Sequence, residues 1–247
     1  MLPYLGIILL MASAGAFVQS AAGFGFALLF MPVAGQLLGI HQAAPLMASM
    51  SMVLNARLFY LHRKAVDWPE ARRLILSALP GLAVGLLLLK YGDPVLLKHL
   101  LGVSLIAYAL YALVIEPLIR PADTPDQPFH RSWMGIVAGF IAGFFGGACA
   151  VNGPPIVVYA AIRRWPRDRF KGVLQAFFLV LNTITVAAYA SAGLVTQSTL
   201  FTALACVPGL IVGAYLGHHA SSRLSPAAFR QAVLVLVLVL GVALVVR

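Results

Sequence analysis

The residues best suited to bind a solute lie in an apolar segment that glycine and proline interrupt, GFIAGFFGGACAVNGPPIVVY from Gly139 to Tyr159. Gly146 and Gly147 carry no side chain, so the backbone there can approach a ligand closely. Asn152 adds a side-chain amide that can donate hydrogen bonds. Free backbone N–H groups at the positive ends of short helices bind anions without a buried cation. This pattern predicts a site for a small oxyanion.

A second interrupted segment lies near the start of the chain, where Gly23 and Gly25 are followed by Pro32. A helix in lipid must satisfy its own backbone hydrogen bonds, so such breaks are tolerated only inside protein or beside a water-filled cavity. Discontinuous helices of this kind are typical of solute sites in secondary transporters. We therefore expect both interrupted segments to contribute to one site.

Close helix packing is the alternative role for glycine in these runs. Gly139, Gly143 and Gly147 recur every four residues, as small residues do where two membrane helices approach closely. Two further pairs share this spacing and are predicted to pack helices: Gly81 with Gly85, and Gly209 with Gly213. For the interrupted segments we favour the site, because proline does more than allow close approach.

Amide side chains also lie within apolar runs. Asn55 and Asn182 occupy equivalent places in the two halves of the chain, each directly after a leucine. A buried amide either joins helices or contacts a ligand, and for this pair the sequence leaves both roles open. Gln19 and Gln175 are interpreted mainly as interhelical hydrogen-bonding groups.

The carboxylates lie in loops or near the ends of apolar runs: Asp67, Glu70, Asp93, Glu116, Asp123, Asp126 and Asp168. Carriers of cations and protons usually keep acidic groups inside the membrane, so a metal cation as substrate is disfavoured. Cys149 and Cys206 lack CxxC partners and histidine-rich neighbours, so we expect free thiols and no metal. The sequence has no HExxH or GxSxG motif, and we expect neither an enzyme activity nor a cofactor.

The elements that must position these residues are membrane helices. Hydrophobic residues make up 62% and charged residues 10% of the 247 residues, against about 45–50% and about 25% in soluble domains. The predicted fold class is therefore all-α, a polytopic helical bundle in the lipid bilayer. The net charge of +10 does not indicate a nucleic-acid partner, because the basic residues lie in short loops between apolar runs.

Two of the apolar runs are too long for one ordinary crossing. The run Leu2 to Ile40 would extend about 58 Å as a single helix, roughly twice the hydrocarbon thickness. The run Trp133 to Ile162 is also too long. Each must cross twice or form a re-entrant hairpin, and the glycine and proline residues mark the interruptions.

The chain divides into two similar halves. Besides the paired asparagines, Pro80 to Gly85 matches Pro208 to Gly213, and Asp93-Pro94 matches Ser225-Pro226, in the same order. Three matches in register indicate an internal repeat. We predict a first transmembrane repeat, a linker and a second transmembrane repeat: 1–120, 121–132 and 133–247.

Charge predicts how the two repeats are oriented. The loops His62 to Arg73 and Arg163 to Gly172 are both rich in Lys and Arg, so both are expected on the cytoplasmic side. Equivalent helices would then run in opposite directions, as in an inverted repeat with a site near the midplane. The alternative is a conventional count of eight spans, which places the second of these loops outside.

The order of these motifs resembles the TauE/SafE family, also called the toluene sulfonate uptake permease family. The resemblance rests on Ala22 to Phe26 followed by Pro32, and on Gly143 to Gly147 followed by Asn152 to Pro155, and it covers essentially the whole chain. It implies a multi-pass carrier of the bacterial inner membrane for sulfite, sulfoacetate or a related organic sulfonate. The two halves differ in their motifs, so they need not contribute equally to the site.

The predicted substrate-binding residues lie in the two interrupted segments and at the paired asparagines: Gly23, Phe24, Gly25, Pro32, Asn55, Gly146, Gly147, Asn152, Pro155 and Asn182. The expected partners are the lipid bilayer and a small anionic solute. No ATP-binding motif is present, so an ion gradient or the substrate's own gradient would drive transport. The alternative function is a membrane-embedded enzyme, or an assembly or structural protein without transport activity.

Overall fold

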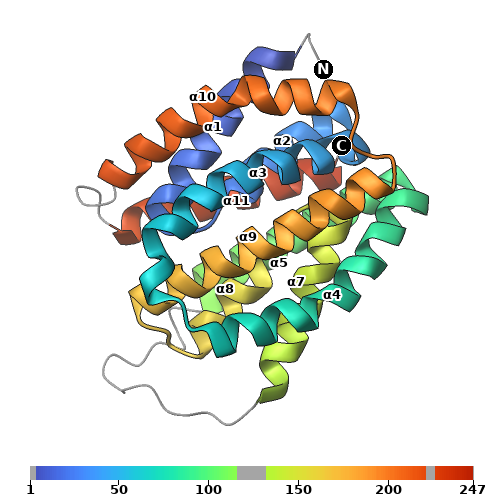
Figure 1. The fold of residues 1–247 in the computed structure, drawn as a ribbon. Helices are drawn as coiled ribbons and strands as arrows, with labels where there is room; N and C mark the ends of the chain where they lie inside the picture. Colours follow the sequence, from blue (N-terminus) through green and yellow to red (C-terminus); the bar gives the residue numbers. More distant parts are fainter. Residues whose placement is uncertain (1–3, 116–131, 221–225, 247) are drawn as a thin grey trace.

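The computed structural model describes residues 4–115, 132–220 and 226–246, and the regular elements within these ranges are all helical (Figure 1). The first half comprises α1 (Leu5–Ala22), α2 (Phe26–Leu38), α3 (Ile40–His62), a 3-10 turn η2 (Arg63–Ala65), α4 (Trp68–Tyr91), α5 (Pro94–Leu110) and a π-helical turn η3 (Tyr111–Ile115). The second half comprises α7 (Ser132–Cys149), α8 (Gly153–Ile162), α9 (Arg167–Ser191), α10 (Gln197–Ala220) and α11 (Pro226–Val246). The predicted linker 121–132 lies outside the described residues, except for its last position.

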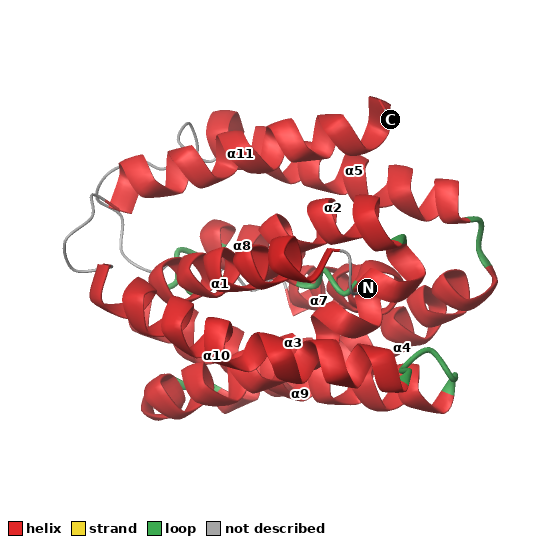
Figure 2. Ribbon diagram, turned by 90° about the horizontal axis from the view of Figure 1, so that it is seen from above, coloured by secondary structure: helices red, strands yellow, loops and turns green. Residues whose placement is uncertain are grey.

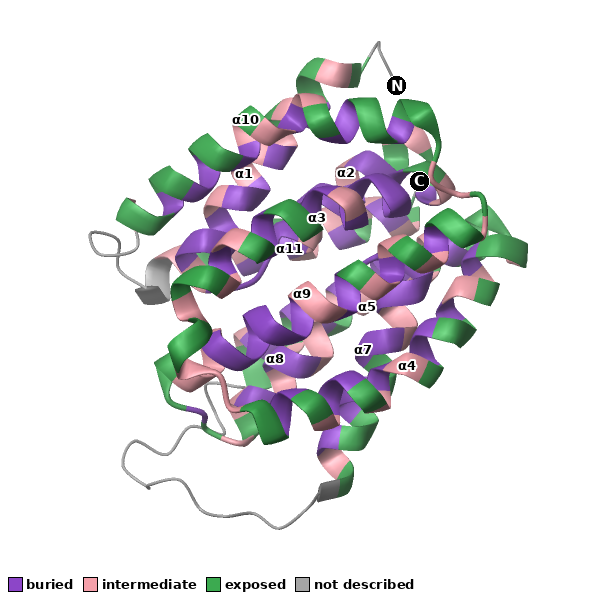
Figure 3. Ribbon diagram, viewed as in Figure 1, coloured by how far each residue is buried: buried purple, intermediate pink, exposed green. Residues whose placement is uncertain are grey.

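Six of the described helices are long and apolar enough to cross a bilayer: α1, α4, α5 with η3, α9, α10 and α11. Their outward side chains are also apolar, as Leu204 and Val212 of α10 and Leu76 of α4 illustrate. Figure 3 shows that buried residues gather in α2, α3, α8 and α9, while exposed ones mark the outer helices. The predicted all-α, multi-pass membrane bundle is confirmed for the described residues.

Local chemistry fixes where several helices begin. The Asp67 carboxylate accepts a hydrogen bond from the Glu70 N–H at the start of α4. The Asp93 carboxylate accepts from Val95 N–H at 2.6 Å at the start of α5. Both helices also carry a proline in their first turn, where its missing N–H costs nothing. These carboxylates therefore cap helix ends outside the apolar centre.

The two long apolar runs each fold into two helices joined by a short break, and these helices pack against each other as α1 with α2 and α7 with α8. The breaks do not fall entirely where the sequence predicted them. Pro32 lies inside α2, and Gly146 and Gly147 lie inside α7, which continues to Cys149. The second break is instead residues 150–152, because the backbone turns at Ala150, whose φ is 55°.

The two halves pack together through equivalent pairs of helices. The first helix of each half packs on the fourth helix of the other half, as α1 with α10 and α7 with α4. The third helices, α3 and α9, pack on each other and form the central pair between α10 and α4 (Figure 1), and α5 packs on α11 (Figure 2). Each half therefore depends on the other to bury its helices.

Glycine permits the closest of these contacts. A Cβ atom at Gly81 of α4 would clash with the carbonyl oxygen of Phe140 in α7, and one at Gly85 would clash with that of Phe144. Likewise, a Cβ atom at Gly213 of α10 would clash with the Ser13 carbonyl oxygen of α1. The predicted packing role of these glycines is confirmed.

The two basic loops lie at the same end of the bundle, at the lower left of Figure 1. The Arg169 guanidinium lies 2.7 Å from the Asp67 carboxylate and joins the two loops. The backbone of Gly172 also lies directly against that of Ala65. Because α3 ends and α9 begins at this end, the two central helices run antiparallel.

Candidate functional site

The break between α1 and α2 consists of residues 23–25, and glycine is required at both of its ends. Gly23 has φ 91° and Gly25 has φ 116°, a backbone conformation that side chains with a Cβ rarely adopt. The Gly23 N–H donates to the Gln19 carbonyl at 2.7 Å and ends α1. The Phe24 side chain between them is buried, with its ring edge-on to those of Tyr108 and Phe170. An aromatic cluster therefore covers this break.

The second break, residues 150–152, ends α7 in a different way. The Ala150 N–H donates to the Gly146 carbonyl and the Val151 N–H to the Phe145 carbonyl, at 3.0 and 3.2 Å. α8 then starts at Gly153, with Pro154 and Pro155 in its first turn. Because proline has no N–H, this helix start offers fewer anion-binding donors than the sequence prediction assumed.

Paired amides tie each break to the third helix of its own half. In the first half, Gln19 Nε2 donates to Asn55 Oδ1 at 2.5 Å, while Gln19 Oε1 accepts from the Phe26 N–H at the start of α2. In the second half, Asn152 Nδ2 donates to Asn182 Oδ1 at 2.8 Å. Asn55 and Asn182, which occupy equivalent places in the predicted repeat, thus each accept a hydrogen bond through Oδ1.

These hydrogen bonds use the oxygen of each paired asparagine and leave its nitrogen available. Within the described residues, no protein acceptor bonds to Nδ2 of Asn55 or of Asn182. Both side chains are buried, on the two antiparallel central helices. An amide N–H₂ group is a pure donor, so the arrangement suits a ligand that presents acceptor oxygens.

Helix α9 also contacts both breaks along its length. Gln175 Nε2 donates to the Gly23 carbonyl at 2.7 Å, and Asn182 holds the second break. The Tyr189 hydroxyl lies 3.0 and 2.8 Å from the carbonyl oxygens of Gly146 and Gly147. The side chain of Lys171 lies against Gly23 at the cytoplasm-facing end predicted from charge. A single helix, α9, therefore connects the two breaks.

The ten predicted site residues do not all reach this region. Gly146 faces it, since a Cβ atom there would lie 3.2 Å from Asn152 Cβ. Gly147 faces α4 instead, because a Cβ atom there would clash with the Leu82 carbonyl oxygen. Pro32 is buried within α2, away from the break itself. Pro155 faces an apolar groove on the other side of the second break.

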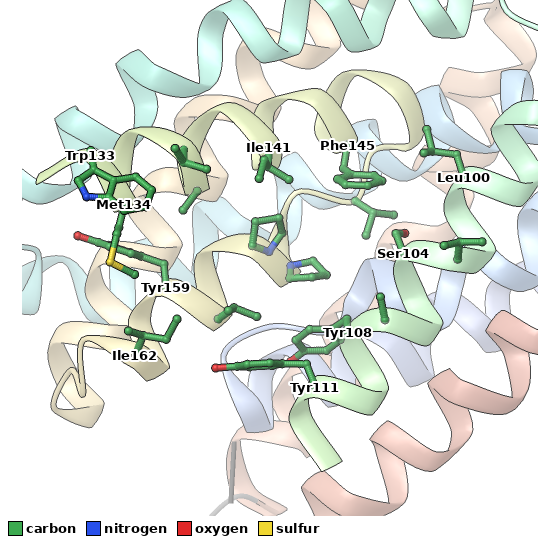
Figure 4. A pocket seen from close by; sticks show the side chains of 18 residues that line it. Leu100, Ser104, Tyr108, Tyr111, Trp133, Met134, Ile141, Phe145, Tyr159 and Ile162 are labelled. Atoms are coloured by element: carbon green, nitrogen blue, oxygen red, sulfur yellow. The ribbon is translucent and has the colours of Figure 1, made fainter. Parts of the chain in front are cut away.

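That groove lies between α5, α7 and α8 and has a volume of about 540 Å³ (Figure 4). Val151, Pro154 and Pro155 of the second break form part of its wall. The polar groups that the described residues contribute to its lining belong to a serine, three tyrosines and a tryptophan: Ser104, Tyr108, Tyr111, Tyr159 and Trp133. Because no charged residue of the described ranges lines the groove, these residues make a poor site for the charged part of an anion.

A buried carboxylate lies near the groove but away from the breaks. Glu70, at the start of α4, pairs with Arg73 and accepts a hydrogen bond at 2.7 Å from the Tyr159 hydroxyl of α8. This cluster joins two helices at the end that holds the basic loops. Among the residues that the structure describes, no group of three or more His, Cys, Asp and Glu could hold a metal ion.

Sequence reasoning missed two residues of this region. Lys171 was counted among the charges of a loop, although it lies in the second turn of α9 and touches Gly23. Gln175 was interpreted mainly as a link between helices, although its oxygen is left without a partner. The available signal was their spacing: both precede Asn182 on one face of a helix, by eleven and seven residues.

Comparisons with known proteins give one consistent answer. A family model described as "Sulfite exporter TauE/SafE" matches residues 7–244 of the chain. The chain is 27% identical over 237 residues to a protein of Cupriavidus necator named "Probable sulfite/organosulfonate exporter TauE", and the alignment covers 94% of this chain and 89% of that protein. No solved structure matches the chain.

Proposed function

Because the chain belongs to the sulfite exporter TauE/SafE family, we propose that it is a secondary transporter that moves sulfite, sulfoacetate or a similar organic sulfonate across the bacterial inner membrane. The family and the six apolar helices make the chain a multi-pass membrane transporter of sulfur-containing anions and not an enzyme.

The observation that carries the proposal is the pair of buried amide nitrogens on α3 and α9. Asn55 and Asn182 each fix one break through their oxygen and keep Nδ2 free of described protein acceptors. A sulfite or sulfonate group presents acceptor oxygens that these donors can bind. The described carboxylates lie at helix starts and do not oppose an anion there.

We infer that the two repeats are inverted and that transport alternates by movement of one repeat against the other. The antiparallel α3 and α9, and the shared end of the two basic loops, support this orientation. The breaks at residues 23–25 and 150–152 supply irregular backbone beside the central helices, as in other transporters with discontinuous helices. The gradient that drives transport would be that of a coupled ion or of the substrate itself.

Flux across an intact bilayer is the direct test. The purified protein, reconstituted into liposomes, should exchange labelled sulfite or an organic sulfonate and discriminate against sulfate and simple carboxylates. Loading the anion first inside and then outside reports the direction in which each gradient drives it. Liposomes with Asn55→Ala/Asn182→Ala protein serve as the matched control. Equal flux in wild-type and empty liposomes for every sulfur oxyanion would refute the proposal.

A further inference from the structure

The first break faces two side chains of α9 that each keep one polar group without a partner among the described residues. Gln175 is fully buried; its Nε2 donates to the Gly23 carbonyl, but no described residue donates a hydrogen bond to its Oε1. Lys171 lies one turn earlier on the same face, with Cγ and Cε 3.4 and 3.9 Å from where a Cβ of Gly23 would be. No described residue forms an ion pair or hydrogen bond with Lys171.

The other half of the molecule does without these groups. Gln175 and Lys171 precede Asn182 by seven and eleven residues, and the residues that precede Asn55 by the same numbers are Ala48 and Ala44. Both alanines are completely buried in α3. At these two positions the first half of the chain therefore packs with only a methyl side chain. Helix packing by itself does not require a long polar side chain there.

The chemistry of the two groups restricts the ligand. An ammonium group attracts a negatively charged oxygen, whereas an amide oxygen accepts hydrogen bonds and repels such an oxygen. A buried acceptor without a donor is costly, so a ligand that brings a donor is favoured over one that does not. An anion that fits both groups therefore carries a negatively charged oxygen and also an O–H or N–H group.

We propose that the first break holds the transported anion in a form that keeps a hydrogen-bond donor, such as hydrogensulfite or a hydroxyalkyl sulfonate. Lys171 pairs with a negatively charged oxygen of the anion, and Gln175 Oε1 accepts the hydrogen bond from its donor. Gly23, which lacks a Cβ, lets the Lys171 side chain lie directly against the backbone of the break. The inference rests on the proposed transport of sulfur oxyanions and deepens it, because it selects a subclass of these substrates.

Two probes of nearly equal size and equal charge test the proposal: 2-hydroxyethanesulfonate, which has an O–H donor, and propane-1-sulfonate, which has a methyl group in its place. Their binding to purified protein is measured by equilibrium dialysis, and their flux is measured in liposomes. Wild-type protein should bind the hydroxylated probe about tenfold more tightly. Gln175→Leu should bring this ratio close to one, while Lys171→Gln should weaken both probes about tenfold and keep the ratio.

Matched variants show whether a change in the ratio of the two affinities arises from a loss of folding. Gln175→Ala reproduces the residue of the equivalent position in α3 and should give the same ratio as Gln175→Leu. Thr183→Ala, at an exposed threonine of α9 that bonds only to the Leu179 carbonyl, should leave both probes unchanged. A ratio unaffected by either Gln175 variant, or a wild-type ratio near one, would overturn the assignment while leaving sulfonate transport intact. Absence of any sulfur oxyanion flux in wild-type protein would instead refute the proposed function.

Discussion

At the scale of single residues, the hydrogen bond between Asn152 and Asn182 holds the second break against the central helix α9. Its removal by Asn152→Ala leaves the buried Asn182 oxygen without its donor and releases the break. We expect the apparent affinity for the transported anion to fall about tenfold, as a lost hydrogen bond to a buried group costs about 1–3 kcal/mol. The measurement is the concentration dependence of flux in liposomes.

A double-mutant cycle tests whether Asn152 and Asn182 act as a pair or independently of each other. If the amides act as a unit, Asn152→Ala/Asn182→Ala should be little worse than either single variant. The corresponding cycle of Gln19→Ala and Asn55→Ala tests the equivalent bond of the first half. Additive losses in both cycles would show that the asparagines act separately and that these bonds do not position the breaks.

The Tyr189 hydroxyl makes a second residue-scale prediction, because it lies within hydrogen-bonding distance of the carbonyls of Gly146 and Gly147 near the end of α7. The last carbonyls of a helix lack partners within that helix. Tyr189→Phe removes the hydroxyl from a fully buried site and should lower the free energy of unfolding by about 1 kcal/mol. Thermal unfolding in detergent measures this loss, and Tyr215→Phe, at an exposed tyrosine, should have no effect. Equal melting temperatures for Tyr189→Phe and wild-type protein would contradict the assignment.

Residue types alone could not tell Gly146 from Gly147. The two glycines are adjacent, but successive residues of a helix point about 100° apart, so one faces Asn152 and the other faces α4. The distinction depends on where α4 lies, which is a property of tertiary packing. By contrast, Asn55 and Asn182 could be singled out from the sequence, because the predicted repeat places an amide at the same position of an apolar run in each half.

At the scale of elements, the contact between α4 and α7 depends on glycine from both helices. A Cβ atom at Gly85 would clash with the Phe144 carbonyl oxygen, and the backbone of a helix cannot move aside as a flexible side chain can. Gly85→Ala should therefore force the helices apart and lower the free energy of unfolding by about 1–3 kcal/mol. Thermal unfolding in detergent provides the measurement.

The control for this prediction is Gly6→Ala in α1, where no atom lies within 4 Å of the new Cβ position. Alanine favours a helix over glycine, so this variant should be neutral or slightly more stable. If Gly85→Ala were as stable as Gly6→Ala, the close approach of α4 and α7 would not be a determinant of stability. The same comparison can be made for Gly213→Ala at the equivalent contact of α10 with α1.

Local sequence determines some helix boundaries in the interrupted segments, and tertiary packing determines others. Pro154 and Pro155 stand in the first turn of α8, where proline is tolerated, so the start of α8 follows from the sequence. Pro32 was expected to mark an interruption, yet it lies within the continuous α2. A proline inside a helix removes one backbone hydrogen bond but need not end the helix when neighbouring helices bury it. The end of α7 at Cys149 has no such sequence signal, because the turn at Ala150 uses a non-glycine residue at positive φ.

At the scale of the whole molecule, the two basic loops provide a single consistent orientation. The ion pair between Asp67 and Arg169 fixes them at one end, and the basic residues that surround it favour the cytoplasmic side. Charge patterning in the sequence was sufficient to predict this pairing of loops. It could not predict which helices of one half pack on helices of the other half. The contacts of α4 with α7 and of α10 with α1 join segments that lie far apart in the chain.

Cysteine accessibility tests the orientation in intact cells. Lys64→Cys and Arg167→Cys place exposed thiols in the two basic loops, in a background in which the buried Cys149 and Cys206 are replaced by alanine. Both thiols should be protected from a membrane-impermeant maleimide until the cells are opened, because the charge of both loops predicts that they face the cytoplasm. Gln197→Cys, at the exposed start of α10, should react in whole cells, since α9 carries the chain from the basic end to the other side. Reaction at only one of the two basic loops in whole cells would rule out the shared end and, with it, the inverted repeat.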